Sequence, residues 1–441
     1  MFKHFFLRHS IWTSQAEQLH LQFMKMMIKK LTLLLFFSLT LSNAQEQNEH
    51  APPAFIKSVQ IRGGPNRGVF PVVQLGEPVN FRFDDLNADE ADYYYRIKYY
   101  NYDWTPSKLF QNAYNEGYDN LRIDDYSTSF NTLQRFTHYS LNIPNENIKL
   151  KVSGNYMIEV YSAYDELVFS RKFCVYENAA SVQAAVYKPQ NMDRFATHQS
   201  LHFAVTPSGT FFANPEENVK VVLLQNYQWD ATITDIKPQY YSGNTLEYRY
   251  QAPTQFEGGN EYFFFDTKDL RVTTPNINYI NRADLYESYL KTDIVRAQLD
   301  YTYAPDINGD FEIRNIMRPG NTNTDADYSF VYFSLAYPYE LEENEEIYIY
   351  GAFNNFELNK LNKMYYNPAL ELYEGVLLLK QGFYNYKYVL KQNDLLYKNS
   401  LSGSHSLAEN EYLILVYYRN IGGRYDALVG VGRANSFELQ N

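Results

Sequence analysis

Few side chains in this chain of 441 residues have the types and spacing that catalysis requires. His198 and His202 are four residues apart, which is the spacing of a zinc pair on a helix. The apolar residues around them alternate as in a strand, and a strand separates the two rings by about 13 Å. Cys174 lies in an apolar run, which is typical of a buried and unreactive thiol. Because the chain also lacks a nucleophile elbow and a phosphate-binding loop, the sequence predicts no catalytic residue, no metal site and no cofactor.

The segment Asp306–Asp310 begins like a calcium-binding loop. Its glycine stands at the fourth position of the loop rather than the sixth, and Met317 occupies the twelfth position, where an EF-hand has Glu. The segment is therefore predicted to be a tight turn.

An acidic cluster lies in the first quarter of the chain. Five carboxylates occur within nine residues: Asp84, Asp85, Asp89, Glu90 and Asp92. They could pair with basic groups on a partner protein or bind Ca²⁺ through oxygen ligands. A solvated loop between two strands is the third interpretation, and the favoured one.

An aromatic cluster follows, made of Tyr99, Tyr100, Tyr102 and Trp104. Large rings of this kind are enriched at protein interfaces, because they offer a large contact area at a small entropic cost. Together with Asp84, Asp85 and Asp89, these rings form our candidate surface for a partner protein. The alternative, which we favour, is that half of the rings fill a core and the rest cover an exposed strand.

Composition points to β-structure. The chain has 43 Tyr, 30 Phe and 3 Trp, and Tyr suits a pleated, half-exposed surface. The formal charge of −12 argues against binding to nucleic acid or to an anionic membrane surface. A single cysteine excludes an internal disulfide and any Cys-based zinc site within one chain.

Alternating hydrophobicity recurs along the chain, as in Val79–Phe83. A hairpin is expected around a turn at residues 163–166, with Tyr156 and Val160 on one side and Phe169 and Phe173 on the other. The predicted fold is all-β, with tandem antiparallel β-sandwich (immunoglobulin-like) domains. A transmembrane barrel fits less well, because charges recur on both strand faces. Residues 284–291 are the one place where a short helix is expected.

The first 44 residues read as a leader that contains a secretory signal peptide. Three lysines precede the apolar run Leu31–Leu41, and the small residues at 42–44 suit a signal peptidase. No cysteine follows the cleavage point, so a lipid anchor at the new N-terminus is not expected. After a linker at 45–51, three β domains are predicted at 52–177, 178–305 and 306–441.

The last domain resembles the glycogen-binding type of carbohydrate module. The resemblance rests on Ile347–Phe356, Tyr373–Leu379 and Gly382–Val389. It places sugar-type positions at Phe356, Lys387 and Tyr397, although Phe356 and Tyr397 stand where the family has Trp. A structural sandwich that has lost its ligand is favoured over an active one.

The mature chain as a whole resembles the plug protein family of the type IX secretion system. The strings that carry this resemblance are Phe83–Tyr95, Tyr102–Pro106, Ser129–Leu133, Ile143–Asn147, Val152–Tyr156, Asp306–Asp310 and Val416–Arg419.

The resemblance implies a non-enzymatic protein of the periplasm, held at the inner side of the outer membrane by its partner. That partner is the large outer-membrane β-barrel translocon, whose periplasmic opening the plug closes when no cargo is passing. The alternative function is an exported glycan-binding module or accessory protein, motivated by the third domain.

Overall fold

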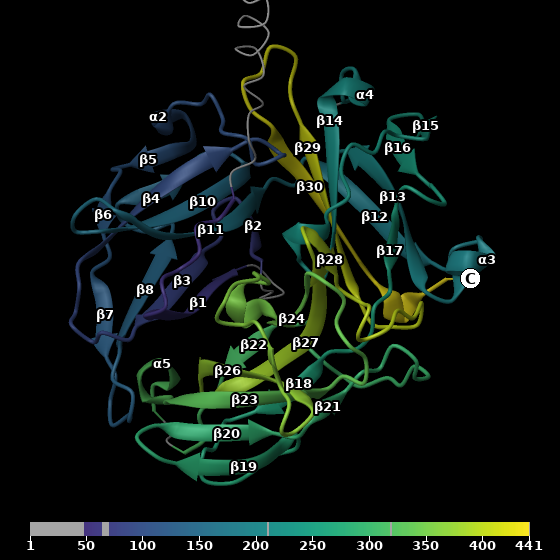
Figure 1. The fold of residues 1–441 in the computed structure, drawn as a ribbon. Helices are drawn as coiled ribbons and strands as arrows, with labels where there is room; N and C mark the ends of the chain where they lie inside the picture. Colours follow the sequence, from purple (N-terminus) through teal and green to yellow (C-terminus); the bar gives the residue numbers. More distant parts are fainter. Residues whose placement is uncertain (1–47, 64–69, 210, 318–319, 441) are drawn as a thin grey trace, which may run out of the picture. The chain divides into compact units, whose positions relative to one another are not determined.

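The computed structural model describes residues 48–63, 70–209, 211–317 and 320–440, and the predicted leader lies outside them. The regular secondary structure of the described part of the chain is mostly strand, which confirms the all-β prediction (Figure 1). Asn48–Asn441 forms one compact unit. No helix within the described ranges has the length and apolar character needed to cross a bilayer.

The first sandwich packs two sheets against each other. One sheet has the order β1 (Ile56–Gly63), β3 (Val79–Asp85), β8 (Thr137–Ile143) and β7 (Asp125–Thr128). The other has the order β2 (Val72–Gln74), β11 (Leu167–Tyr176), β10 (Gly154–Ser162), β4 (Tyr93–Tyr100) and β6 (Leu121–Arg122). Strands β10 and β11 form the expected hairpin, with Tyr156 opposite Phe173 and Val160 opposite Phe169. Alternate residues of these strands fill the core between the sheets.

The second sandwich combines segments that are far apart in the sequence. Its first sheet contains β12 (Ala180–Tyr187), β13 (His198–Pro207), β16 (Thr245–Tyr248), β15 (Tyr240–Ser242) and β17 (Gln255–Glu257). Its second sheet contains β14 (Val219–Gln225), β29 (Glu411–Tyr418) and β30 (Ala427–Asn435). The C-terminal strands β29 and β30, in yellow, therefore run beside β14 (Figure 1).

The third sandwich is built mainly from the segment between these. One layer contains β18 (Phe263–Asp266), β27 (Gly382–Gln392), β22 (Phe311–Ile313), β24 (Glu345–Tyr350) and β28 (Leu395–Tyr397). The other contains β19 (Ile277–Arg282), β20 (Tyr286–Leu290), β23 (Tyr328–Ala336), β26 (Leu372–Lys380), β25 (Tyr365–Asn367) and β21 (Asp293–Ile294). The short helix expected at 284–291 is wrong, because β20 is held between β19 and β23 and buries Ser288 and Leu290.

The remaining elements are short. A two-stranded ribbon pairs β5 (Asn115–Gly117) with β9 (Ile148–Leu150). Single helical turns are α2 (Gln111–Tyr114), α3 (Met192–Phe195), α4 (Pro215–Asn218), α5 (Thr322–Asp325), η1 (Trp229–Ala231), η2 (Ala352–Asn354) and η3 (Ser436–Glu438).

Strand pairing crosses one of the predicted domain limits. The limit at 177/178 falls between β11 and β12, whereas strands on both sides of 305/306 share sheets. Strands β18–β21 pair with strands of the predicted third domain, and β29 and β30 pair with the predicted second domain. We therefore propose that the second domain is discontinuous, comprising about 178–257 and 408–441.

Candidate functional site

The aromatic cluster predicted as a partner surface is largely interior. Tyr100 and Trp104 are buried where the outer face of the first sandwich meets the sheet of β14, β29 and β30. The contact is made by side chains from both sheets: Val72, Met157, Cys174, Val222, Leu224, Leu413, Leu415, Tyr417 and Leu428. These two rings thus form an interface, but one between two sandwiches of the same chain.

The neighbouring tyrosines also bind within the chain. The hydroxyl of Tyr99 donates to the carbonyl oxygens of Ser153 and Asp426, at 2.9 and 3.0 Å. Tyr102 is partly buried, and its backbone N–H donates to the carboxylate of Asp426 at 3.2 Å. Asp426 follows β29 in the sequence, so this cluster ties the first sandwich to the C-terminal hairpin.

Asp84 of the candidate surface is also buried, and it joins the first sandwich to the third. Its carboxylate accepts from the Lys380 ammonium at 2.6 Å and from the Tyr328 hydroxyl at 2.7 Å, and it contacts His138 Nδ1 at 2.6 Å. Burial would raise the pKa of Asp84, but Lys380 and His138 together hold it below its ordinary value. The Asp84 carboxylate therefore binds partners within the protein.

The other acidic residues do not converge on one point. Asp85 is buried, and burial raises its pKa although it accepts from the Tyr93 hydroxyl at 2.8 Å. Asp89 is exposed, and Asp92 pairs with Arg122 at 2.6 Å. Among the described residues, no group of three or more His, Cys, Asp or Glu side chains could hold a metal ion.

Five of the seven residues of the candidate surface are thus buried, and the use of this set as a partner surface stays a prediction. The physical reason for the burial is that Tyr100 and Trp104 pack against the second sandwich, while Asp84 binds Lys380 and Tyr328 of the third. The Trp104 Nε1 group has no hydrogen-bond partner among the described residues, so apolar packing rather than hydrogen bonding holds this ring. Only Asp89 and part of Tyr102 reach solvent.

The sugar-type positions of the third sandwich have different environments. Lys387 is buried, its ammonium donates to Asn399 at 3.2 Å, and burial lowers its pKa to about 7. Phe356 is partly buried and packs on Tyr350 with ring centroids 5.0 Å apart. Tyr397 is exposed. A surface-bound sugar would reach only part of this set.

Two of the residue patterns that suggested chemistry have structural roles. His198 and His202 lie on strand β13, and His202 Nε2 is within 3.1 Å of the Tyr250 carbonyl, whereas His198 Nδ1 contacts the Thr197 hydroxyl. The Asp306–Asp310 segment is a turn in which the Asp306 carboxylate accepts from the Asn308 N–H at 2.7 Å. The predicted strand and the predicted turn are both confirmed.

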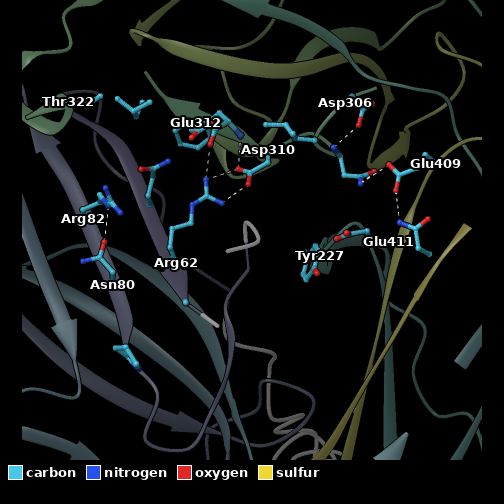
Figure 2. Close-up of a pocket in the computed structure, with 18 of the residues that line it drawn as sticks. Arg62, Asn80, Arg82, Tyr227, Asp306, Asp310, Glu312, Thr322, Glu409 and Glu411 are labelled. Carbon is cyan, nitrogen blue, oxygen red and sulfur yellow. Dashed lines mark hydrogen bonds and ion pairs between the residues drawn. The ribbon is translucent and has the colours of Figure 1, made fainter. Parts of the chain in front are cut away.

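A large polar cavity lies where all three sandwiches contribute residues. Its volume is about 1230 Å³, and Figure 2 shows its lining. Strands β1 and β3 form one side, the segment from Asp306 to Ile313 forms another, and the ends of β29 and β30 form a third. This cavity could not be predicted from the sequence, because its lining residues are separated by up to several hundred positions.

One ion pair crosses the cavity wall. The Arg62 guanidinium donates to both carboxylate oxygens of Asp310, at 2.5 and 2.7 Å, and to the carbonyl of Phe311 at 2.9 Å (Figure 2). Both side chains are 15% exposed. Bidentate pairs of this kind fix orientation as well as adding energy, so the pair sets the position of β1 against β22.

The opposite wall is acidic. Burial raises the pKa of Asp306 to about 7, although its carboxylate accepts from the N–H groups of Asn308 and Tyr262. Burial also raises the pKa of Glu409, which accepts from the side-chain amides of Asn308 and Asn435 at 3.0 and 2.8 Å (Figure 2). The arrangement can hold positive charge, but it offers no nucleophile paired with a base.

These features define a class of protein: a set of packed β-sandwiches in which buried charged groups join one sandwich to another. Residues 56–177 match the family model described as "Type 9 secretion system plug protein 1st domain". The chain is also similar to a crystal structure of a hypothetical protein from Parabacteroides merdae, with a TM-score of 0.84 and 30% sequence identity. That similarity covers 89% of this chain and 100% of the other. A search of the curated proteins found no match. The chain belongs to the type IX secretion system plug family.

Proposed function

We propose that this protein is a non-enzymatic plug subunit of the periplasm. It binds the outer-membrane β-barrel translocon of the type IX secretion system and seals its periplasmic opening when no cargo is exported. The observation that carries the proposal is the family match over 56–177, which makes the protein a type IX secretion-related plug protein.

The interior of the molecule supports a role as an obstruction. A seal must keep its shape against a pore, which requires that its domains do not move independently. Here buried rings join the first sandwich to the second, and the Asp84–Lys380 pair joins the first to the third. A compact body of this length has a radius of gyration of about 21 Å. Buried contacts therefore hold the three sandwiches together, as a rigid obstruction requires.

Affinity purification tests the binding step. The tagged full-length protein, recovered from detergent-solubilised outer membranes, should bring down a very large β-barrel protein. Recovery of only soluble proteins or glycans would contradict the proposal.

Permeability tests the sealing step. Deleting the gene should increase uptake of a large antibiotic, and deleting the translocon as well should abolish that increase, since no open pore then remains. Equal permeability in all strains would contradict a sealing role.

Two further measurements address catalysis and sugar binding. Turnover of any substrate by the purified protein would contradict a purely structural role. Binding of maltooligosaccharides at millimolar or tighter affinity, lost on Phe356→Ala, would favour a glycan-binding module instead. The burial of Lys387 leaves this side chain little surface for contact with a sugar.

A further inference from the structure

The lining of the inter-sandwich cavity carries a surplus of negative charge. Six carboxylates line it: Glu77, Asp306, Asp310, Glu312, Glu409 and Glu411. Two arginines also line it, of which Arg62 is paired with Asp310, and Glu312 is paired with Arg314 from outside the lining. The second, Arg82, donates to the side-chain oxygens of Asn80 and Asn323, at 2.8 and 3.2 Å. The lining carboxylates that lie outside these ion pairs therefore outnumber the lining cations, and this excess of negative charge favours a cationic ligand.

Two polar side chains in the cavity have no partner within the described residues. Gln60 of β1 is only 8% exposed, and its side-chain amide makes no hydrogen bond to the described chain. The carboxylate of Glu411, at the start of β29, likewise has no donor there (Figure 2). The Gln60 amide is not among the fully buried groups that lack a partner, so water in the cavity reaches it, and a ligand that donates hydrogen bonds can take the place of that water.

The chemistry of the lining selects among cations. A guanidinium presents five N–H donors, which suits carboxylate and amide oxygens presented together. Aromatic rings also line the cavity, and Tyr303 and Phe437 are in edge contact at 5.5 Å. Such rings attract arginine through cation–π contacts. The lining therefore suits arginine better than a simple ammonium ion.

The volume of the cavity indicates whether the arginine belongs to a small molecule or to a peptide segment. Small-molecule sites usually measure about 300–1,000 Å³, whereas this cavity measures about 1230 Å³. A single amine or amino acid would leave most of it unfilled. A peptide segment with a basic side chain fills the volume and supplies the charge.

We propose that this cavity is the docking site for an arginine-bearing segment of the partner protein. The inference rests on the proposed function, because it names the chemistry by which the plug would recognise its partner. Glu411 would pair with the guanidinium, Gln60 would accept a hydrogen bond from the same segment, and the Arg62–Asp310 pair would hold the two walls at a fixed separation.

The test is titration of the full mature chain with the capped peptide acetyl-Gly-Arg-Gly-amide. We expect the peptide to bind, and its affinity to fall as the salt concentration rises. Glu411→Gln should lower that affinity about tenfold. The matched control is Glu343→Gln, an exposed glutamate outside the cavity, which should leave the affinity unchanged. Circular dichroism of each variant verifies that it is folded. Gln60→Met, which removes the free amide at similar volume, should also weaken binding.

Three results would overturn the inference. They are no binding of the peptide, equal binding of a peptide with uncharged citrulline in place of arginine, and equal effects of Glu411→Gln and Glu343→Gln. Binding of spermidine as tight as that of the peptide would also overturn it, since the cavity would then be a site for small cations.

Purification from outer membranes separates this inference from the proposed function. If wild-type protein recovers the barrel and Glu411→Gln recovers it equally well, the cavity is not the docking site and the plug function stands. If wild-type protein recovers no barrel, the plug function fails whether or not the peptide binds.

Discussion

At the scale of single residues, the charges that matter most are those hidden from water. Asp84 and Lys380 are 0% and 2% exposed, and they come from sandwiches separated by almost 300 positions in the chain. A buried ion pair gains little over a well-packed apolar pair, but losing one partner leaves an uncompensated charge. We therefore expect the pair to favour one arrangement of the joint between the first and third sandwiches over others.

Substitution of Lys380 tests this. Lys380→Met should lower the free energy of unfolding by about 3–5 kcal/mol, because Asp84 then stays buried without its cation. The control is Lys363→Met, which breaks the partly exposed pair with Glu346 and should cost less than about 1 kcal/mol. Urea denaturation measures the free energy of unfolding of both variants. Equal losses in the two would show that the buried pair contributes no more to stability than the partly exposed one.

Asp306 should make stability depend on pH. Its pKa is about 7 in the folded protein against an ordinary 3.8, so the folded state binds more protons than the unfolded state between those values. The free energy of unfolding should therefore fall as pH rises from about 4 to about 7. Asp306→Asn removes this contribution, so its destabilising effect should be larger near pH 4 than near pH 8.

Urea denaturation of wild-type protein and Asp306→Asn at the two pH values measures this difference. The exposed Asp394 provides a control for substitution of a surface carboxylate, and Asp394→Asn is measured at the same two pH values. A pH-independent effect of Asp306→Asn would refute the prediction.

At the scale of elements, the second sandwich depends on strands from the end of the chain. Strand β14 pairs along its length with β29, from Val219 opposite Tyr418 to Gln225 opposite Tyr412. The core of the second sandwich contains Tyr412, Ile414, Val416 and Val429 from the C-terminal hairpin. Without these strands β14 keeps no sheet partner among the described strands, and an apolar sheet face is left in water.

Fragments test this dependence. The contiguous segment 178–305 should not fold alone, whereas 178–257 joined by a short linker to 408–441 should give a cooperative unfolding transition. Circular dichroism and limited proteolysis distinguish the two. A folded, protease-resistant 178–305 fragment would contradict the discontinuous domain.

At the scale of the whole described unit, apolar contact and ion pairing join the sandwiches at different places. The first and second share an apolar cluster that includes Trp104, while Arg62–Asp310 and Asp84–Lys380 join the first to the third. Because unfolding one sandwich alone would expose the buried contacts that it makes with the others, we expect the three sandwiches to unfold together. This is the property that a plug needs.

Calorimetry tests that cooperativity. The full mature chain should unfold in a single transition whose van't Hoff and calorimetric enthalpies agree. Two or three resolved transitions would show that the sandwiches are independent, and would weaken the argument that the protein acts as a rigid obstruction.

The amino-acid sequence by itself determined the all-β fold and the individual hairpins, because a period of two along Tyr156–Val160 or Val79–Phe83 is a local property of strands. It also carried the strings by which the plug family is recognisable. The turn at Asp306 was predictable for the same reason, since its Asn-Gly pair acts locally.

Only the tertiary structure decided which charges and rings are buried. Asp84, Tyr100 and Trp104 have the composition of a surface anchor, yet each is covered by residues more than 100 positions away. The same holds for the cavity, which Gln60 and Glu411 both line because β29 returns to pair with β14. Long-range strand pairing leaves no periodic trace in the sequence, so neither the joints nor the cavity could be predicted from it.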